Sequence, residues 1–328
     1  MHTKNRLLEI FEANKGLPIS GVQLAKELSV SRNAIWKAIQ TLREDGYAIT
    51  AAINKGYCLA ADSDVLSAEG IRPFLHCDKH INGQNIPIMV YPSLSSTNQT
   101  AKELAVANAT HGTVVISNCQ SDGKGRYGRA FFSPSGSGLY MSIIWKPDNP
   151  NILPPTAITA FAAVCVCEAI AAITGQEPSI KWVNDLFLNG KKVCGILTEA
   201  VTDFESHRLQ WAVIGIGINI AAPPEGFPPA LQSVAGALYS TNPPPIRCRL
   251  AAEIINRILC DTRPDANAIF AAYRERLFIL GKRLAVTDIN ETYNAVALDI
   301  DGTGRLLVQT DNGEQRTLSS GEVQLHAL

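Results

Sequence analysis

The sequence lacks the cysteine and histidine patterns that mark a secreted disulfide scaffold or a structural zinc site. Its eight cysteines include no Cys-x-x-Cys pair, and its six histidines are scattered along the chain. The opening residues, Met1 to Asn5, also lack the apolar core of a secretion signal. We therefore expect a cytoplasmic protein with reduced thiols.

The sequence is also poor in charge. Only 18% of its 328 residues are charged and 46% are hydrophobic, which excludes a disordered or collagen-like chain. This length suits about two domains, with room for a smaller third. Residues 1–60 hold eight basic and five acidic side chains, a net of +3, whereas the remaining 268 residues carry a net of −4. Contacts with nucleic acid are therefore expected only near the N-terminus.

One long apolar run, residues 156–173, raises the question of a membrane span. Its only charged residue is Glu168, but its alanines and threonines make it weakly hydrophobic. Pro154 and Pro155 are typical of a helix start and Gly175 of a helix end. We predict a buried helix and no membrane partner.

The first sixty residues carry helix-turn-helix spacing. Apolar residues recur at helical intervals in three segments, and Ser20 and Ser31 are placed to cap the second and third helices. Alternation around residues 54–56 predicts the hairpin of a winged helix. Because a net charge of +3 is modest, we expect a dimer to bind DNA more tightly than a single copy. The alternative is that this winged helix is a protein-interaction module. The residues expected to face DNA are Arg32, Asn33, Trp36, Lys37, Gln40 and Lys55.

The most informative stretch is residues 120–129, which follow a predicted strand at 113–119. In it three glycines alternate with three cations, a composition suited to holding a phosphate or an adenylate. A Rossmann fingerprint would have to open a helix, but an alternating strand pattern follows at 139–145. The sequence also lacks a P-loop motif. A flexible basic surface loop is the alternative interpretation.

Further along, residues 179–188 and 191–200 are predicted to form two strands joined by a type I′ turn at Asn189-Gly190. The first strand would contain the segment Lys181 to Asp185 and the second would begin with Lys191-Lys192. Lysines and an aspartate brought together in this way could serve phosphates and Mg²⁺. An ordinary exposed strand face is the alternative.

The remainder reads as one buried strand, two helices and a set of short strands. The strand is expected at 211–220 and the helices at 247–261 and 266–280. From Val296 onward, alternating residues and turns predict a small β-barrel. The barrel could close over a substrate or simply stabilise the chain.

Four motifs in this order resemble the bifunctional biotin protein ligases and biotin operon repressors of the BirA type. They are the winged helix ending in Lys55-Gly56-Tyr57, Ser96-Thr97-Asn98, the segment Gly123 to Arg129, and Lys181-Trp182-Val183-Asn184-Asp185 with Lys192-Val193-Cys194-Gly195-Ile196. The resemblance implies an α+β chain with three domains. These are a winged helix-turn-helix at 1–62, a mixed-sheet biotin/lipoate ligase catalytic domain at 63–280 and an SH3-like β-barrel at 281–328.

The resemblance implies a reaction as well as a fold. Biotin and ATP, with Mg²⁺, would give biotinyl-AMP and pyrophosphate, and a lysine of the biotin carboxyl carrier protein of acetyl-CoA carboxylase would then take the biotin. Biotinyl-AMP would also act as corepressor by promoting a homodimer on the operator DNA of biotin genes. A repressor whose ligase has decayed is one alternative. A lipoate or octanoate transfer enzyme is another, although the winged helix and the basic glycine loop argue against it.

The family's functional residues transfer to matching positions. Those implied for biotin are Ser96, Thr97, Asn98, Gln120, Lys124, Gly125, Arg126 and Lys192. Those implied for the nucleotide are Arg126, Arg129, Phe131, Lys181, Asn184, Asp185 and Asn219, with Asp185 also the metal candidate. The catalytic candidates are Arg126, Lys181 and Lys192. The departures from the family pattern bear on affinity rather than on the reaction; they are Lys124 for Arg, Phe131 for Trp, Val183 for Pro and Cys194 for Ala.

Overall fold

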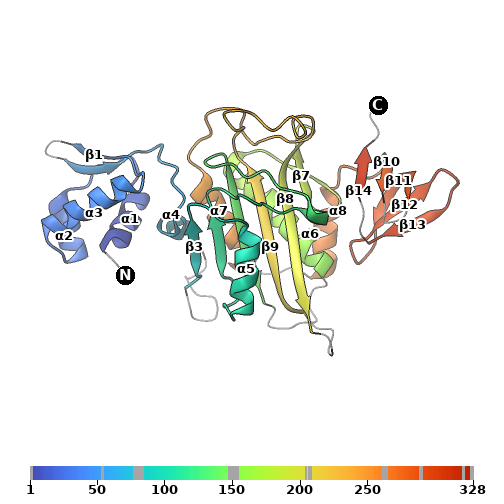
Figure 1. Cartoon of the computed structure of the whole chain (residues 1–328), viewed down its shortest axis with the longest axis horizontal. Coiled ribbons are helices and arrows are strands. Elements are labelled where there is room, and N and C mark those ends of the chain that lie inside the picture. The colour runs from blue at the N-terminus through green and yellow to red at the C-terminus, as the bar shows by residue number, and fades with distance from the viewer. Residues whose placement is uncertain are drawn as a thin grey trace.

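The chain folds into three parts that lie in a row, with the N-terminal helices at one end and a small sheet at the other (Figure 1). The structure is a computed structural model. It describes residues 3–52, 55–76, 85–146, 155–203, 205, 209–260, 265–287, 291–319 and 322–325. Asn54, Cys77, Pro154 and Asp261, which carried sequence predictions, lie outside the described residues.

The N-terminal part is the predicted winged helix. It consists of α1 Thr3–Ala13, α2 Gly21–Leu28, α3 Arg32–Glu44, β1 Ile49–Ala52 and β2 Gly56–Leu59. The hydroxyl of Ser20 accepts a hydrogen bond from the Val22 amide, and that of Ser31 accepts one from the Ala34 amide. Both predicted caps are therefore confirmed. The three helices enclose a core of their own, with fully buried side chains from Leu7, Phe11, Leu24, Ile39 and Leu42.

A short connection leads into the central part, which is built on a seven-stranded sheet. The connection contains α4 Ala68–Ile71, which begins after its N-cap residue Ser67. The strand order is β3-β4-β5-β9-β8-β7-β6; the first pair is parallel and the rest are antiparallel. The bounds are β3 Ile88–Tyr91, β4 Val114–Ser117, β5 Gly138–Trp145, β6 Ser179–Lys181, β7 Asp185–Leu188, β8 Lys191–Thr202 and β9 Leu209–Asn219.

Helices cover both faces of this sheet (Figure 1). Helix α5 Thr97–Val106 packs on one face, where Ala101 and Ala105 meet Val115, Ile144 and Val213. The neighbouring side chains on the same strands point to the opposite face, because side chains alternate along a strand. There they join the main core with α6 Pro155–Thr174, α7 Arg247–Ile255 and α8 Ala266–Glu275.

The apolar helix α6 belongs to this core. Two-thirds of its most apolar stretch, Thr156–Thr174, is buried within the fold. It ends where Gly175 takes a φ of +70°, as the sequence predicted. The interpretation as a buried helix rather than a membrane span is confirmed.

The predicted strand 179–188 is wrong as a single element. The chain reverses at Trp182 to Asn184, so that β6 and β7 pair with each other, and Lys181 faces Asp185. Two distant contacts hold this reversal: the indole nitrogen of Trp182 donates to the Gly304 carbonyl at 3.0 Å, and the Asn184 amide donates to the Ile196 carbonyl at 2.7 Å. The next turn is as predicted, since Asn189 and Gly190 both have positive φ.

The C-terminal part is a five-stranded antiparallel sheet with the order β13-β12-β11-β10-β14. Its bounds are β10 Arg283–Thr287, β11 Thr292–Ile300, β12 Leu306–Thr310, β13 Gln315–Leu318 and β14 Glu322–Leu325. A bulge between Ala297 and Asp299 shifts the register of β11, which leaves Leu298 exposed. The two helices before this sheet are shorter than predicted, because a π-helical turn over Asn256–Cys260 follows α7 and α8 ends at Glu275.

The cysteine prediction holds for six residues and fails for one. The free cysteines are Cys58, Cys119, Cys165, Cys167, Cys194 and Cys248. Cys260 is disulfide-bonded, contrary to the expectation of reduced thiols throughout. Sequence spacing could not reveal this bond, because the approach of two cysteines is set by the fold rather than by a motif.

Candidate active site

A cavity of about 640 Å³ opens in the central part of the chain. Its wall comes from the start of α5, the segment 124–132, the β6–β7 reversal and the glycines of β8 and β9. The C-terminal sheet contributes Val323 and Gln324. The residues that line the cavity are therefore spread over more than 220 positions of the sequence, from Ser96 to Gln324.

The start of α5 supplies a polar floor. The Ser96 hydroxyl caps the helix, and Ser96, Thr97 and Asn98 are all buried. The Gln120 side-chain oxygen accepts hydrogen bonds from the Thr97 amide at 2.8 Å and from the Thr97 hydroxyl at 3.1 Å. These buried groups offer directed polar contacts to a neutral polar ligand.

Asn98 is fixed by a buried network below this floor. Its oxygen accepts from the Ser142 hydroxyl at 2.6 Å, and its amide nitrogen donates to Glu199 Oε2 at 2.9 Å. Gly215 must lack a side chain here, since a Cβ would lie 2.0 Å from Asn98 Oδ1. Burial alone would raise the pKa of the Glu199 carboxyl, but hydrogen bonds from Lys102 and Asn98 outweigh burial and hold that pKa below its usual value.

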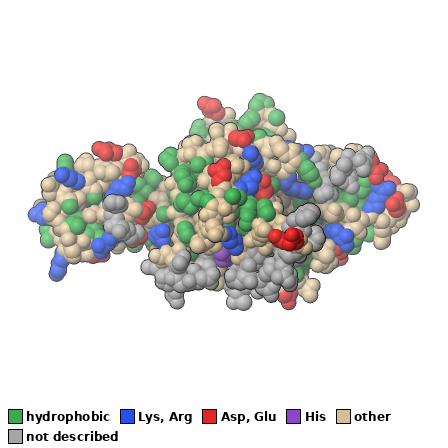
Figure 2. All heavy atoms as spheres, turned by 60° about the horizontal axis from the view of Figure 1, so that its bottom comes forward, with side chains coloured by type: hydrophobic (Ala, Val, Ile, Leu, Met, Phe, Trp, Pro, Cys, Tyr) green, Lys and Arg blue, Asp and Glu red, His purple; other side chains and the backbone are tan. Residues whose placement is uncertain are grey.

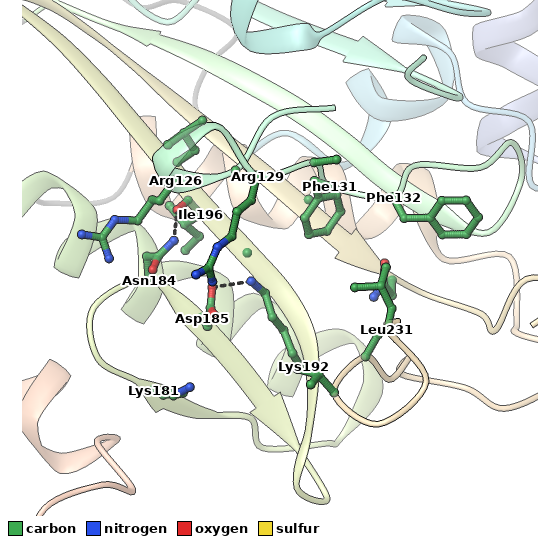
Figure 3. Close-up of a pocket in the computed structure, with 18 of the residues that line it drawn as sticks. Arg126, Arg129, Phe131, Phe132, Lys181, Asn184, Asp185, Lys192, Ile196 and Leu231 are labelled. Atoms are coloured by element: carbon green, nitrogen blue, oxygen red, sulfur yellow. Dashed lines mark hydrogen bonds and ion pairs between the residues drawn. The ribbon is translucent and has the colours of Figure 1, made fainter. Parts of the chain in front are cut away.

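The glycine-rich segment folds back on itself beside the cavity. The Gly125 amide donates to the Arg129 carbonyl at 2.7 Å, and the Phe131 amide donates to the Gly123 carbonyl at 2.7 Å. The Arg126 guanidinium lies 4.9 Å from the centre of the neighbouring Tyr127 ring. In Figure 3 Arg126 points away from Lys192, whereas Arg129 reaches toward Asp185.

The Phe131 ring lies against two glycines of the central sheet. A Cβ on Gly217 would come within 2.6 Å of this ring, and one on Gly195 within 3.2 Å. Both glycines therefore make room for an aromatic side chain in the cavity. A flat apolar face at this point suits the stacking of a planar base.

The charged end of the cavity centres on one ion pair. The ammonium nitrogen of Lys192, at the start of β8, lies 2.6 Å from Asp185 Oδ1, at the start of β7 (Figure 3). Lys181 and Asn184 come from the same reversal of the chain and also line the cavity. The Asn219 amide at the end of β9 donates to the Gly236 carbonyl at 2.9 Å.

The donor set fits a metal that is held mostly by its substrate. Within the described residues, no three His, Cys, Asp or Glu side chains lie together as a metal cluster. Asp185 is the carboxylate that lines the cavity. Mg²⁺ is commonly bound by one or two carboxylates together with substrate phosphates, so Asp185 could hold it in that way.

The predicted DNA-binding face lies on the separate N-terminal part. Arg32, Asn33, Trp36 and Lys37 are exposed on α3, with Trp36 at 50% exposure, and Lys55 is exposed before β2. Gln40 on the same helix is half-buried. Figure 2 shows Lys and Arg side chains at several points of this part of the molecule, at the left of the view.

Comparison with known proteins assigns all three parts of the chain. Residues 90–219 match the Biotin/lipoate A/B protein ligase family, residues 3–58 an HTH domain and residues 279–326 the Biotin protein ligase C terminal domain. The chain is 35% identical to the bifunctional ligase/repressor BirA of Bacillus subtilis over 96% of both chains. The chain belongs to the BirA family.

Two further matches agree with this membership. The Escherichia coli bifunctional ligase/repressor BirA is 34% identical over 62% of this chain and 59% of its own. The structure of the Aquifex aeolicus biotin protein ligase in complex with biotin and ATP has a TM-score of 0.60 at 23% identity. It covers 73% of this chain and 98% of its own. This last likeness concerns the fold.

In this BirA-family chain, the residues predicted from motifs come together in one place. Every residue predicted for biotin, nucleotide or metal lines the cavity, although they come from four separate segments of the sequence. The residues that line it without having been predicted include Phe227, Leu231, Val234, Val323 and Gln324. The loop residue Val234 is held there because its carbonyl accepts a hydrogen bond from the Lys192 amide at 2.8 Å. No motif marked that loop, so only its apolar residues within a proline-rich stretch could have drawn attention to it.

Proposed function

We propose that this BirA-family chain joins biotin to ATP and then passes biotin to a lysine of the biotin carboxyl carrier protein of acetyl-CoA carboxylase. In the first step a biotin carboxylate oxygen attacks the α-phosphorus of ATP, and pyrophosphate leaves. In the second step the amine of the acceptor lysine attacks the acyl carbon, and AMP leaves. One observation carries this proposal: a single cavity joins a polar floor, a charged centre and an aromatic wall.

Each part of the cavity has a task in this reaction. The floor at Ser96, Thr97, Asn98 and Gln120 would hold the polar ring of biotin, and Lys124 and Gly125 would border it. Lys192 would face the biotin carboxylate, and Lys181 would balance charge that develops at the α-phosphate. The residues proposed for the nucleotide are Arg126, Arg129, Phe131, Asn184, Asp185 and Asn219. Mg²⁺, bound by Asp185 and the phosphates, would neutralise phosphate charge.

The same chain would act as a repressor of biotin genes. The outward side chains of α3 are able to reach base edges and phosphates in a major groove. A homodimer promoted by biotinyl-AMP would place two such helices on two half-sites of an operator. In this proposal residues 1–62 bind DNA, residues 63–280 catalyse the reaction and residues 281–328 complete the cavity, in a cytoplasmic protein.

The ligase proposal is tested by acceptor labelling. Purified protein is incubated with Mg-ATP, biotin and a carrier-protein fragment, and mass spectrometry follows biotin on the acceptor lysine. A fragment with that lysine changed to arginine is the matched control. Labelling of the first fragment alone is expected. Formation of biotinyl-AMP without labelling would favour a repressor without ligase activity.

A further inference from the structure

Two turns of the C-terminal sheet share one backbone arrangement. They are the turn at 301–305, between β11 and β12, and the turn at 310–314, between β12 and β13. In each, the amide of the first residue donates to the carbonyl of the fifth, and the amide of the fourth donates to the carbonyl of the first, all at 2.9 Å. The fourth residue is a glycine with positive φ, Gly304 at +81° and Gly313 at +85°.

The two turns differ in their surroundings. A Cβ on Gly304 would lie 2.5 Å from the Phe270 ring of α8, whereas one on Gly313 would meet no atom of the described residues within 4 Å. The Gly304 carbonyl also accepts a hydrogen bond from the indole nitrogen of Trp182 at 3.0 Å. Gly304 and Trp182 are both buried, so this hydrogen bond is shielded from water. The turn at 301–305 therefore joins the C-terminal sheet to the central part of the chain.

The Asp301 carboxylate fixes the turn at 301–305 from within. Its Oδ1 accepts hydrogen bonds from the Thr303 amide at 2.8 Å, the Thr303 hydroxyl at 2.7 Å and the Arg305 amide at 3.0 Å. Its Oδ2 accepts one from Arg305 Nε at 2.7 Å. These bonds hold the residues on both sides of Gly304, so they fix the direction of the Gly304 carbonyl. Asp301 itself is not one of the residues that line the cavity.

The indole held by Gly304 belongs to the reversal between β6 and β7. Three polar side chains of this reversal line the cavity, those of Lys181, Asn184 and Asp185. A carbonyl that holds the Trp182 indole therefore helps to fix where these side chains lie. A displacement of about 1 Å in groups of this kind is enough to slow a reaction.

We propose that Asp301 is a positioning residue for the nucleotide, because it holds the Gly304 carbonyl toward the Trp182 indole and so keeps the reversal in place. The inference rests on the proposed function, in which the polar side chains of the reversal contact ATP. The polar floor proposed for biotin is built from the start of α5 and Gln120 instead. Asp301 should therefore affect the use of ATP and leave the binding of biotin unchanged.

The test measures ATP and biotin separately in Asp301→Ala. Pyrophosphate release at saturating biotin gives the KM for Mg-ATP, and calorimetry without nucleotide gives the dissociation constant of biotin. The KM should rise about tenfold, as for the loss of one buried hydrogen bond, while the dissociation constant of biotin stays within about twofold of wild type. Asp301→Asn keeps an oxygen in the place of Oδ1 and should restore most of the wild-type KM.

Asn312→Ala is the matched control in the turn at 310–314. The Asn312 side-chain oxygen accepts from the Glu314 amide at 3.2 Å, so this variant loosens a turn of the same backbone in the same sheet. Its KM for Mg-ATP should equal that of wild type. An equal rise in Asn312→Ala and Asp301→Ala would mean that any loosening of the sheet has this effect, and would overturn the inference.

A double-variant cycle tests whether Asp301 acts through Trp182. Trp182→Phe keeps an aromatic ring but removes the indole nitrogen, and it should raise the KM for Mg-ATP by a similar factor. Adding Asp301→Ala to Trp182→Phe should raise the KM no further, because the hydrogen bond is already lost. Effects that multiply would overturn the inference. If Asp301→Ala does not fold, Trp182→Phe decides alone: a raised KM with unchanged biotin binding supports the inference, and a wild-type KM overturns it.

The outcomes separate the inference from the function on which it rests. If Asp301→Ala weakens ATP and biotin alike, or neither of them, the inference alone is overturned. If wild-type protein releases no pyrophosphate from Mg-ATP and biotin, the proposed function and the inference fall together.

Discussion

The ammonium nitrogen of Lys192 lies 2.6 Å from Asp185 Oδ1, and each side chain keeps about a quarter of its surface exposed (28% and 24%). The two charges neutralise each other across neighbouring strands, at the end of the cavity where anionic groups are expected. Asp185 therefore orients the Lys192 ammonium, which can then bind an incoming carboxylate in place of Asp185.

Lys192→Gln should slow adenylate formation by roughly 10²-fold, since it removes a charge aimed at the reacting groups. Pyrophosphate release in the presence of Mg-ATP and biotin measures this rate. Lys26→Gln, on the exposed surface of α2, should leave it unchanged. A Lys192 variant as fast as wild type would remove this residue from the reaction.

Arg247 joins the connection after the winged helix to the catalytic core. Its Nε donates to Asp64 Oδ2 at 2.7 Å, and its Nη1 donates to Asn118 Oδ1 at 2.7 Å. Arg247→Ala leaves the partly buried Asp64 carboxylate without this partner, which should cost about 2 kcal/mol, as for a lost hydrogen bond to a charged group. The melting temperature should fall by about 3 °C.

The control for the Arg247→Ala variant is an arginine–aspartate ion pair on the protein surface. Arg274 donates to Asp299 with 54% and 38% of the two side chains exposed. Because exposed pairs contribute little, Arg274→Ala should barely move the melting temperature. Equal falls in the two variants would contradict the role given to burial at Arg247.

Glu12 should make stability depend on pH. Its carboxylate on α1 is fully buried beside the Lys15 ammonium at 2.6 Å. Burial raises the pKa of Glu12 above 4.5, the Lys15 contact opposes this, and nearby Asp64 adds to it. A carboxyl with a raised pKa contributes most stability below pH 4.5 and loses it as pH rises through its folded pKa.

Glu12→Gln removes that titration, so the variant should gain stability relative to wild type as pH rises above 4.5. Urea unfolding at several pH values measures the difference in the free energy of unfolding between variant and wild type. Removal of the ion pair with Lys15 shifts this difference by the same amount at every pH, so the test is how the difference changes with pH. Glu27→Gln, at an exposed position on α2, should show no trend. A difference that shrinks with rising pH would contradict the burial argument.

The outward face of α3 should bind DNA without affecting catalysis. Replacing Arg32 and Lys37 together by Gln should weaken operator binding and lower the salt dependence, by about 0.9 in the log–log slope for each DNA phosphate that is no longer neutralised. Ligase activity should stay at the wild-type value, because these residues lie outside the cavity. Fluorescence anisotropy over a salt series measures the affinity and its salt dependence. Unchanged DNA binding would favour a protein-interaction role for this domain.

Local signals in the sequence were sufficient for the elements that local chemistry decides. The caps at Ser20 and Ser31 and the turn at Asn189-Gly190 depend on neighbours a few residues away, and all were predictable. The reversal at Trp182 was not, because one of the two contacts that hold it is with Gly304, 122 residues further along. Alternating hydrophobicity cannot reveal such an anchor.

The residues of the cavity also divide into those that the sequence predicts and those that only the fold brings together. Residues in contiguous motifs could be named from sequence, since glycines next to cations or a capped helix start have a recognisable chemistry. Ser142 and Glu199 could not, because they lie 44 and 101 positions from Asn98 and stand in ordinary strand patterns. Only the pairing of the strands brings them beneath the floor.

The most direct test of the account is native mass spectrometry of the purified chain with Mg-ATP and either biotin or lipoate. The account predicts that biotinyl-AMP stays bound and that a dimer appears with it, whereas lipoate gives no retained adenylate. Retention of lipoyl-AMP in place of biotinyl-AMP, or of neither, would contradict the assignment of this cavity.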